Sequence, residues 1–202
     1  MTHFYVPAEG HRLPHDPLKA LVAPRPIGWI SSVDAEGRPN LAPYSFFNLL
    51  SERPPIVGFS SSGVKDSQAN VEATGEFVCN LATFDLREAV NATSAPLPRG
   101  ASEFDFAGLT PVPSEKVRAP RVGEAAAALE CVYLMSLPLK GRDGTGQSTL
   151  VLGEVIGVHI DPRVLVDGIV DQTRLNAISR LGGADYAAVT ADVLFSMRRP
   201  GA

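Results

Sequence analysis

The sequence predicts a mainly β protein whose strands close, or partly close, into a barrel. The 202 residues include 18 glycines and 17 prolines spread along the whole length, which indicates many turns and excludes a long coiled coil or a simple helical bundle. Six or seven β-patterned runs are separated by short helical patterns. Closure into a barrel removes the exposed edges that such strands would otherwise present.

The first predicted strands form a hairpin near the N-terminus. Residues 26–33 are apolar on both alternating sets until two serines, which is typical of a strand buried on both faces. Residues 34–37 turn the chain, and residues 38–44 return as a second strand. After two consecutive prolines, residues 56–59 form a third strand.

Two helices flank the fourth predicted strand. The first covers residues 66–73 and ends at Gly75, and the strand covers residues 76–82. The second helix covers about residues 85–93 and begins with a capping box. Residues 95–121 hold five prolines and are predicted to be irregular.

The C-terminal half carries the longest strand patterns. Residues 127–137 and 148–160 are joined by the glycine-rich residues 140–147, which indicates a β-hairpin. A short helix near residues 173–180 and an apolar run over residues 187–197 close the chain. No Ser/Gly-rich linker divides the sequence, so we predict one domain over residues 1–202.

Charge and hydropathy limit the classes of partner. The net charge of −4 gives no electrostatic footprint for binding nucleic acid or an anionic membrane. No apolar run approaches the roughly 18 residues of a spanning helix, and the first residues lack a basic region followed by an apolar stretch. We therefore expect a cytoplasmic protein whose partners are small molecules or other proteins.

Cysteine and histidine spacing predicts no metal site. Cys79 and Cys131 are far apart, without a CxxC pair or a neighbouring histidine, and are predicted to be buried free thiols. The four histidines likewise show no spacing typical of metal ligands.

Two glycine-containing motifs resemble catalytic motifs, but each lacks a required feature. Residues 141–148 come close to a phosphate-binding loop, yet Gln147 stands where that loop needs lysine, and a strand pattern follows instead of a helix. Residues 58–63 miss the spacing of a nucleophile elbow by one. Neither a nucleotide triphosphatase nor a serine hydrolase is predicted.

Glu130 and Glu154 are in phase with apolar neighbours on their strands. They could form a pair for acid and base chemistry. An ion pair with an arginine, or exposure on a solvated face of the barrel, is the favoured interpretation.

Residues 60–70 form a candidate anion site. The chain leaves a strand, turns at Gly63 and opens a helix, so that free backbone N–H groups, several hydroxyls and the Lys65 ammonium group come together. This set suits a phosphate monoester. A serine-rich helix cap without a ligand is the alternative.

Residues 42–48 place three aromatic side chains directly after a strand. Aromatic rings beside free backbone amides could enclose a flat heteroaromatic ring, whereas a barrel corner capped by aromatics would need no ligand. Asn80 is predicted to be a buried amide whose partners are protein or ligand groups.

Taken together, these residues resemble the flavin reductase-like, FMN-binding split-barrel family, to which flavoredoxins belong. The resemblance covers a core of about residues 20–190. In chain order it is carried by residues 23–32, 37–48, 54–57 and 65–67 with Asn70, and by residues 77–81, 91–94 and 180–187.

The resemblance implies a homodimeric, six-stranded split β-barrel of Greek-key type with short peripheral helices and FMN at the subunit interface. The residues that it implies for the phosphate and ribityl chain are Ser31, Ser32, Ser61, Lys65, Asp66, Ser67 and Asn70. Those implied for the isoalloxazine ring are Ser45, Phe46, Phe47 and Asn48, with Arg180 and Tyr186 closing the groove.

The activity implied is hydride transfer from NADH or NADPH to flavin N5, with the protein orienting the cofactor and no side chain obliged to act as acid or base. The reduced flavin would then serve a downstream monooxygenase or another electron acceptor. An FMN-carrying electron-transfer protein without NAD(P)H activity is the alternative. A pyridoxine-phosphate oxidase-like activity is disfavoured, since no additional basic cluster would hold a second phosphate.

Overall fold

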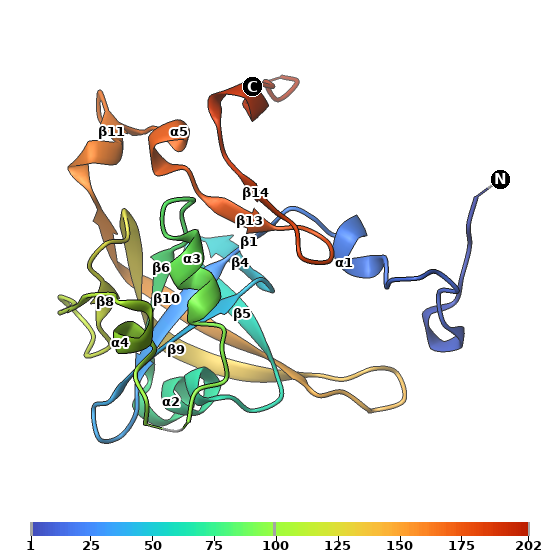
Figure 1. Cartoon of the computed structure of the whole chain (residues 1–202), viewed down its shortest axis with the longest axis horizontal. Coiled ribbons are helices and arrows are strands. Elements are labelled where there is room, and N and C mark those ends of the chain that lie inside the picture. The colour runs from blue at the N-terminus through green and yellow to red at the C-terminus, as the bar shows by residue number, and fades with distance from the viewer. Residues whose placement is uncertain (1, 99, 202) are drawn as a thin grey trace.

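The structure is a computed structural model that describes residues 2–98 and 100–201. Its main sheet is antiparallel and has seven strands in the order β3-β2-β6-β9-β10-β5-β4 (Figure 1). The strands are β2 (Gly28–Val33), β3 (Pro39–Tyr44), β4 (Phe47–Glu52), β5 (Pro55–Ser62), β6 (Glu76–Leu81), β9 (Ala127–Leu139) and β10 (Ser148–Ile160).

The sheet curls because its two edge strands are consecutive in the chain. β3 and β4 lie at opposite ends of the strand order, yet Ser45 and Phe46 alone connect them. The two edges must therefore approach each other. The Ser60 N–H of β5 donates a hydrogen bond to the Phe46 carbonyl (2.8 Å), which extends the β4–β5 pairing into this short connection. This confirms the mainly β barrel, split between β3 and β4.

Shorter elements surround this sheet. The remaining strands are β1 (Arg25–Pro26), β7 (Pro111–Val112), β8 (Arg121–Val122), β11 (Leu165–Val166), β12 (Ile169–Val170), β13 (Ile178–Arg180) and β14 (Tyr186–Ala188). The helices are α1 (Leu18–Leu21), α2 (Asp66–Thr74), α3 (Arg87–Ala92), α4 (Glu103–Ala107) and α5 (Gln172–Leu175), with 3₁₀ turns η1 (Pro7–Glu9), η2 (Pro162–Val164) and η3 (Ala191–Val193). In the part of the chain that the structure describes, none of these helices has the length and apolar character needed to cross a membrane.

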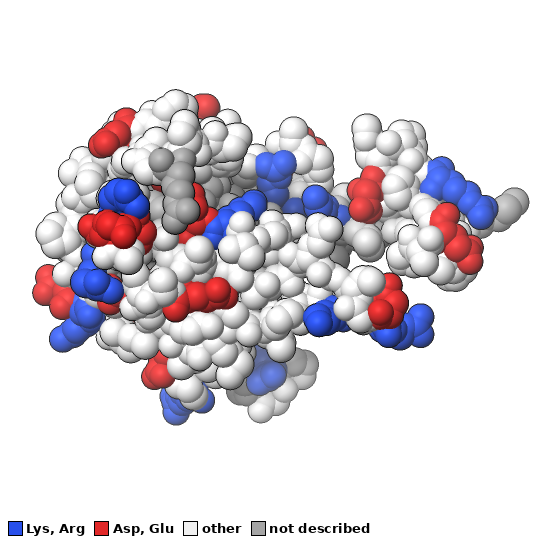
Figure 2. Space-filling model, turned by 90° about the horizontal axis from the view of Figure 1, so that it is seen from below, with Lys and Arg blue, Asp and Glu red and all other residues white. Residues whose placement is uncertain are grey.

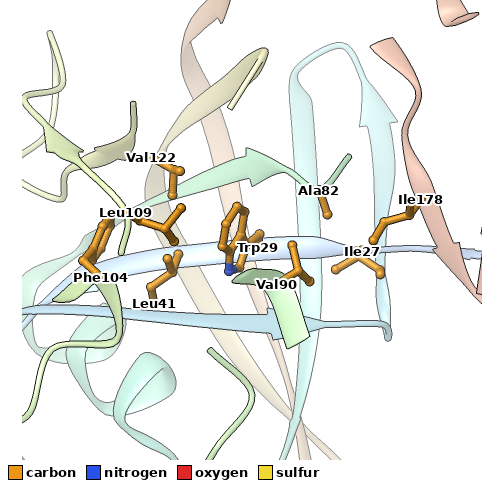
Figure 3. Close-up of a cluster of buried hydrophobic side chains, with 9 residues drawn as sticks. All are labelled: Ile27, Trp29, Leu41, Ala82, Val90, Phe104, Leu109, Val122 and Ile178. Atoms are coloured by element: carbon orange, nitrogen blue, oxygen red, sulfur yellow. The ribbon is translucent and has the colours of Figure 1, made fainter. Parts of the chain in front are cut away.

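Strand β2 is buried along its entire length, as its sequence predicts. Successive side chains of a strand point to opposite faces of the sheet. Trp29 accordingly packs with Phe104 of α4 and Val90 of α3 on one face (Figure 3). Ile30 joins a second cluster with Phe59. The two hydrophobic clusters hold β2 between them.

Several elements lie where the sequence predicts none, and β4 and α4 are the two that matter for the site. Residues 47–52 form the edge strand β4, and only the first two of them belong to the aromatic patch predicted over residues 42–48. Within the region predicted to be irregular, the Ser102 hydroxyl accepts a hydrogen bond from the Asp105 N–H and caps α4. A five-residue helix buries too few side chains to leave a periodic pattern.

Two helix predictions are wrong in extent. The helix expected over residues 173–180 ends at Leu175, since Asn176 takes a left-handed conformation (φ 46°), and the chain then forms β13 against β1. The helix expected from Asp85 begins at Arg87, and its N-cap residue makes no side-chain capping bond. The capping box predicted there is therefore not formed.

Candidate functional site

A hollow of about 450 Å³, here called the main hollow, lies where three segments of the chain meet. Its walls come from β3, from the connection between β5 and α2, and from residues 93–97, with Glu103 of α4 beside them. Lys65, Asp66 and Ser67 of the predicted phosphate site all line it.

The connection from β5 to α2 presents the first turn of a helix to the main hollow. Gly63 makes this turn possible with a φ of 71°, which glycine adopts without strain, and its N–H donates to the Gln147 carbonyl (2.8 Å). Lys65 is the N-cap residue of α2 and provides no side-chain cap. The first N–H groups of this helix are therefore available to a ligand.

The opposite wall is held by a buried side-chain hydrogen bond. Trp29 Nε1 donates to Thr93 Oγ1 (2.9 Å), and Thr93 Oγ1 donates to the Val90 carbonyl (3.0 Å). These bonds join β2 to the end of α3, across 64 positions in the sequence. They place Thr93 and Ser94 at the rim of the main hollow.

Tyr44 contributes a buried hydroxyl that has no hydrogen-bond partner among the described residues. The residue is 7% exposed, lines the main hollow, and its ring packs against Phe59 with centroids 4.7 Å apart. Burial raises the pKa of Tyr44, the Asp66 and Glu103 carboxylates add to the rise, and nearby Ser67 and Ser61 oppose it. The hydroxyl therefore stays protonated and can donate.

Two carboxylates share the main hollow with one ammonium group. Lys65 is exposed, and none of the ion pairs formed by the described residues includes it. Glu103 accepts a hydrogen bond from the Leu41 N–H (3.0 Å). Burial raises the pKa of Glu103 and the Asp66 charge raises it further, although the Leu41 hydrogen bond acts against this.

A network of small polar side chains fastens α2 to the barrel. Asn40 Nδ2 donates to Ser67 Oγ (2.9 Å), and Asn70 Nδ2 donates to Ser32 Oγ (3.2 Å). Asn40 Nδ2 also lies 3.4 Å from Ser32 Oγ. Ser32 and Asn70, both predicted cofactor ligands, therefore contact each other in this structure.

The hydroxyls of Ser31 and Ser61 are used within the protein. Ser31 points to the face of β2 opposite to Ser32 and donates to the Pro120 carbonyl (2.5 Å), while Ser61 donates to the Gly63 carbonyl (2.9 Å). Both residues are fully buried. Neither hydroxyl is free for a ligand.

The buried amide of Asn80 has protein partners. Its Nδ2 donates to the Trp29 carbonyl and to Ser31 Oγ (3.1 Å each), and its Oδ1 accepts from the Val122 N–H (2.8 Å). Of the two alternatives left open by the sequence, the structure shows the protein one.

The predicted ring-binding residues Ser45–Asn48 follow Tyr44 but do not line the main hollow. The Phe47 ring lies against Gly28 and lines an apolar hollow of about 210 Å³ beside β13. Phe46 is half exposed, with the Arg25 guanidinium 5.8 Å from its ring centroid. Asn48 Oδ1 accepts the Leu49 N–H (2.9 Å).

Arg180 and Tyr186 contact each other on the β13–β14 hairpin. The Arg180 guanidinium carbon lies 4.5 Å from the Tyr186 ring centroid. Tyr186 lines a third hollow, of about 240 Å³, together with Arg87 and Asn91 of α3. Helix α3 therefore lines this hollow, whereas the residues that follow it, from Thr93 onward, line the main hollow.

Arg25 is a residue that the sequence analysis missed. It is 7% exposed, donates to the carbonyls of Lys19, Val22 and Leu181, and has an Nε atom without a partner among the described residues. It joins α1, the β13–β14 turn and Phe46. A single arginine carries no periodic signal that could have revealed this role.

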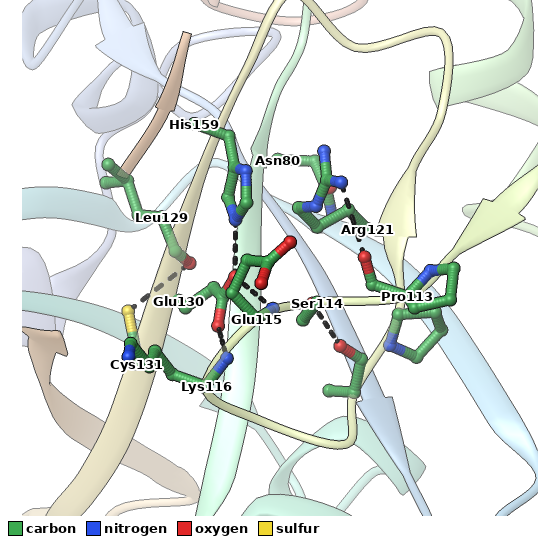
Figure 4. Close-up of polar contacts among 12 residues, drawn as sticks. Asn80, Pro113, Ser114, Glu115, Lys116, Arg121, Leu129, Glu130, Cys131 and His159 are labelled. Carbon is green, nitrogen blue, oxygen red and sulfur yellow. Dashed lines mark hydrogen bonds and ion pairs between the residues drawn. The ribbon is translucent and has the colours of Figure 1, made fainter. Parts of the chain in front are cut away.

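A second buried polar cluster surrounds Glu130 (Figure 4). The carboxylate is fully buried and accepts hydrogen bonds from the N–H groups of Glu115 (2.8 Å) and Lys116 (2.6 Å) and from His159 Nε2. Its partner is thus a histidine, not the expected arginine, and Glu154 is half-buried. Burial by itself would raise the pKa of Glu130, but the hydrogen bonds to the carboxylate have the larger combined effect, so the pKa is lowered.

Both cysteines are buried free thiols, as predicted. Burial raises the pKa of Cys79 to about 12 and raises that of Cys131 as well. Neither thiol is activated as a nucleophile.

The main hollow also contains residues that were not among the predicted ligands, namely Tyr44, Thr93, Ser94 and Glu103. Tyr44, Thr93 and Ser94 lie in segments that carry the family resemblance, so this signal was present in the sequence. Glu103 lies in the region predicted to be irregular, and only the fold brings it to the site.

The donor set of the main hollow fits a phosphate monoester. The exposed Lys65 ammonium group, the unpartnered Tyr44 hydroxyl and the uncapped first turn of α2 are donors that lack an acceptor among the described residues. Anionic oxygens bind well to such sets of N–H and O–H groups. These three donors have the chemistry needed to hold an anion, beside the carboxylates of Asp66 and Glu103.

Comparison with known proteins places this geometry in context. Residues 21–175 match the family described as "Flavin reductase like domain". An uncharacterised protein of Halalkalibacterium halodurans is 36% identical over 197 residues, covering 95% of this chain and 91% of that protein.

Two solved structures are similar over most of their length. Nitrilotriacetate monooxygenase component B from Bacillus cereus has 33% identity and a TM-score of 0.87, with coverage of 98% of this chain and 99% of that one. A split barrel domain protein from Shewanella frigidimarina has 24% identity, a TM-score of 0.80 and coverage of 90% and 89%, which supports the split-barrel fold.

Proposed function

The chain belongs to the flavin reductase-like family, and from this premise we propose that it is an FMN-binding oxidoreductase that accepts hydride from NADH or NADPH. The observation that carries the proposal is the set of donors without acceptors in the main hollow. Lys65, Tyr44 and the first turn of α2 offer positive charge and hydrogen bonds to a phosphate group.

Bound FMN would supply a hydride-accepting N5 and the onward transfer of electrons. In the proposal, Lys65, Asp66 and Ser67 hold the phosphate end, and Asn70 with Ser32 fixes the position of α2. Ser31 and Ser61 support the backbone and do not contact the ligand through their hydroxyls.

The remaining predicted residues are assigned to the ring end of the cofactor. Backbone N–H groups of Ser45–Asn48 would stabilise the negative charge that develops on the reduced ring, as an oxyanion hole does. Arg180 and Tyr186, held together on the β13–β14 hairpin, would cover the ring and exclude water. No side chain is required to transfer a proton.

We propose a homodimer because one face of the sheet is apolar and exposed. Leu137 pairs with Leu150 and Met135 with Leu152, so these side chains share a face with Leu50, which packs over Gly58. We call these five residues Leu50, Met135, Leu137, Leu150 and Leu152 the outer apolar face. Leu50, Met135 and Leu137 are each more than half exposed.

Exposed apolar surface of this extent is typical of an interface. Much of the surface seen in Figure 2 also carries no charged side chain. A second copy of this chain would cover the outer apolar face.

The electron acceptor is proposed to be a separate protein. The relative from Bacillus cereus is by its name one component of a monooxygenase. Delivery of reduced flavin to a partner oxygenase is therefore the role that we favour. A carrier that receives electrons from another protein is the alternative, and we expect the protein to act in the cytoplasm.

The absorbance spectrum of the purified protein and its titration with FMN test the cofactor. We expect a flavin spectrum or a saturable change of FMN fluorescence, and the absence of both would contradict the proposal. NADH or NADPH oxidation with added FMN then separates the two roles. Turnover supports the reductase, whereas flavin binding without turnover with either nucleotide supports the carrier.

A further inference from the structure

We propose that the Tyr44 hydroxyl donates a hydrogen bond to the phosphate group of the bound ligand and makes the main hollow selective for the phosphorylated flavin over riboflavin. This inference rests on the proposed function, because it concerns the same site. It names the residue that distinguishes a phosphate monoester from the corresponding alcohol.

The first observation is that the Tyr44 hydroxyl is buried without a partner. The residue is 7% exposed, and its hydroxyl oxygen forms no hydrogen bond with a described atom, although the Ser61 and Ser67 side chains lie near it. Leaving a buried polar group unpaired costs about 1–3 kcal/mol. A phenylalanine would avoid this cost while keeping the contact with Phe59, so the hydroxyl is expected to serve a ligand.

The second observation is where the hydroxyl lies. The Ser61 and Ser67 side chains lie close to it, and these residues flank Lys65 on either side of the β5–α2 turn. The hydroxyl is therefore at the same end of the main hollow as Lys65 and the uncapped first turn of α2. Three kinds of donor thus meet at one place.

The third observation concerns charge. The side chains lining the main hollow include one ammonium group, Lys65, and two carboxylates, Asp66 and Glu103. A phosphate group is not drawn to this set by net charge, so neutral donors must contribute much of its binding. Hydrogen bonds to a charged acceptor are about twice as strong as neutral ones. Loss of one such donor should therefore lower the affinity for FMN, which carries the phosphate, much more than the affinity for riboflavin, which carries an alcohol there.

The two neighbouring serine hydroxyls each take part in a hydrogen bond within the protein. Ser61 donates its proton to the Gly63 carbonyl. Ser67 accepts from Asn40 and keeps its own proton, so it remains a second neutral donor. Ser67 and Tyr44 are both buried, and Tyr44 is the one whose hydroxyl oxygen has no hydrogen-bond partner among the described residues.

The test compares FMN with riboflavin on the wild type and on Tyr44→Phe, by quenching of flavin fluorescence. We expect Tyr44→Phe to weaken FMN about tenfold and riboflavin less than twofold. The control is Tyr133→Phe, which removes a half-buried hydroxyl bonded to Ser136 (3.1 Å) away from the main hollow. That variant should leave both affinities unchanged. Equal weakening of both ligands, or none, overturns the inference.

The free energy of unfolding of the ligand-free protein, measured in urea, distinguishes a ligand-binding role of the Tyr44 hydroxyl from a structural one. Since replacing an unpaired buried hydroxyl with hydrogen is neutral or stabilising, Tyr44→Phe should be at least as stable as the wild type. A destabilised Tyr44→Phe would show that the hydroxyl bonds the protein and would overturn the inference.

Failure of the proposed function gives a different result. If the wild type binds neither flavin, the flavin proposal fails, and inorganic phosphate becomes the probe. A rise in melting temperature with phosphate that is larger for the wild type than for Tyr44→Phe would still support a phosphate contact by Tyr44. An equal rise, or none in either protein, would overturn it.

Discussion

The buried Glu130 carboxylate on β9 contacts His159 Nε2 on β10 and accepts hydrogen bonds from the backbone N–H groups of residues 115 and 116. One side chain thereby joins the central hairpin to the long connection between β7 and β8. The same connection is fastened further along, where the Pro120 carbonyl accepts from Ser31. Buried charge is tolerated here because several donors surround it.

Glu130→Gln should lower the free energy of unfolding at pH 7 by about 1–3 kcal/mol, since donors lose a charged acceptor. The pKa of Glu130 is lower in the folded protein, so its stabilising effect is present above the unfolded value of about 4.3 and is lost as the pH falls through the folded value. Urea unfolding between pH 7 and pH 3.5 should show a steeper loss for the wild type than for the variant.

The exposed, ion-paired Glu36 is the matched control for Glu130. Glu36→Gln should change stability by less than about 0.5 kcal/mol. If Glu130→Gln retained the acid sensitivity of the wild type, the assignment to Glu130 would be wrong.

Thr93→Val should weaken both the fold and the site. The substitution leaves the buried Trp29 N–H without an acceptor, at a cost of about 1–3 kcal/mol, and frees residues 93–97 at the rim of the main hollow. Urea unfolding and FMN titration measure the two effects. Thr93→Ser keeps the hydroxyl acceptor, so its stability and its FMN affinity should be close to those of the wild type. Thr190→Val, at an exposed hydroxyl bonded to Asp192, should change neither.

Gly28→Ala should destabilise the protein by about 1–3 kcal/mol, because the new Cβ would lie 2.5 Å from the Phe47 ring. Phe47→Ala should disturb the spectrum of bound flavin more than it disturbs folding. In a double-mutant cycle, Gly28→Ala should cost less when Phe47 is already alanine. Strict additivity of the two changes would contradict the packing of Phe47 on Gly28.

Lys65→Ala should weaken FMN by roughly 1.5–3 kcal/mol, the range for losing a hydrogen bond to a charged group. Fluorescence titration measures this loss. Lys140→Ala, in the exposed turn of the β9–β10 hairpin, is the control and should bind FMN normally. An unchanged affinity of Lys65→Ala would place the phosphate elsewhere.

Leu137→Lys should convert the proposed dimer to a monomer, since it buries a charge in the outer apolar face. Sedimentation velocity of the ligand-free variant and wild type measures the change. Phe106→Lys, at an equally exposed apolar residue of α4, should leave the dimer intact. A wild-type protein that sediments as a monomer would refute the proposed dimer itself.

The sequence predicts most strands because their patterns are local. The β9–β10 hairpin and β2 are present as expected. β4 was missed for a physical reason, since a bulge between Leu49 and Ser51 breaks its alternation and both Leu49 and Leu50 are exposed. Helix α5 was overextended because the left-handed Asn176 that ends it gives no apolar signal.

The candidate site was predictable in part. Lys65, Asp66 and Ser67 lie in one turn at the start of a helix, so their proximity follows from sequence spacing. Ser31 and Ser32 are adjacent in sequence but face opposite sides of β2, and the sequence does not tell which side faces α2. The ring-end residues are spread over separate hollows.

By itself, the sequence determined the barrel class, the turns and the glycine turn that leads into α2, because these depend on the order of neighbouring residues. Only the tertiary structure decided that Tyr44, Lys65 and Glu103 share one hollow, and that His159 is the partner of Glu130. Such contacts depend on how a curled sheet brings distant segments together. Hydrophobic periodicity does not predict which polar groups come into contact as a result.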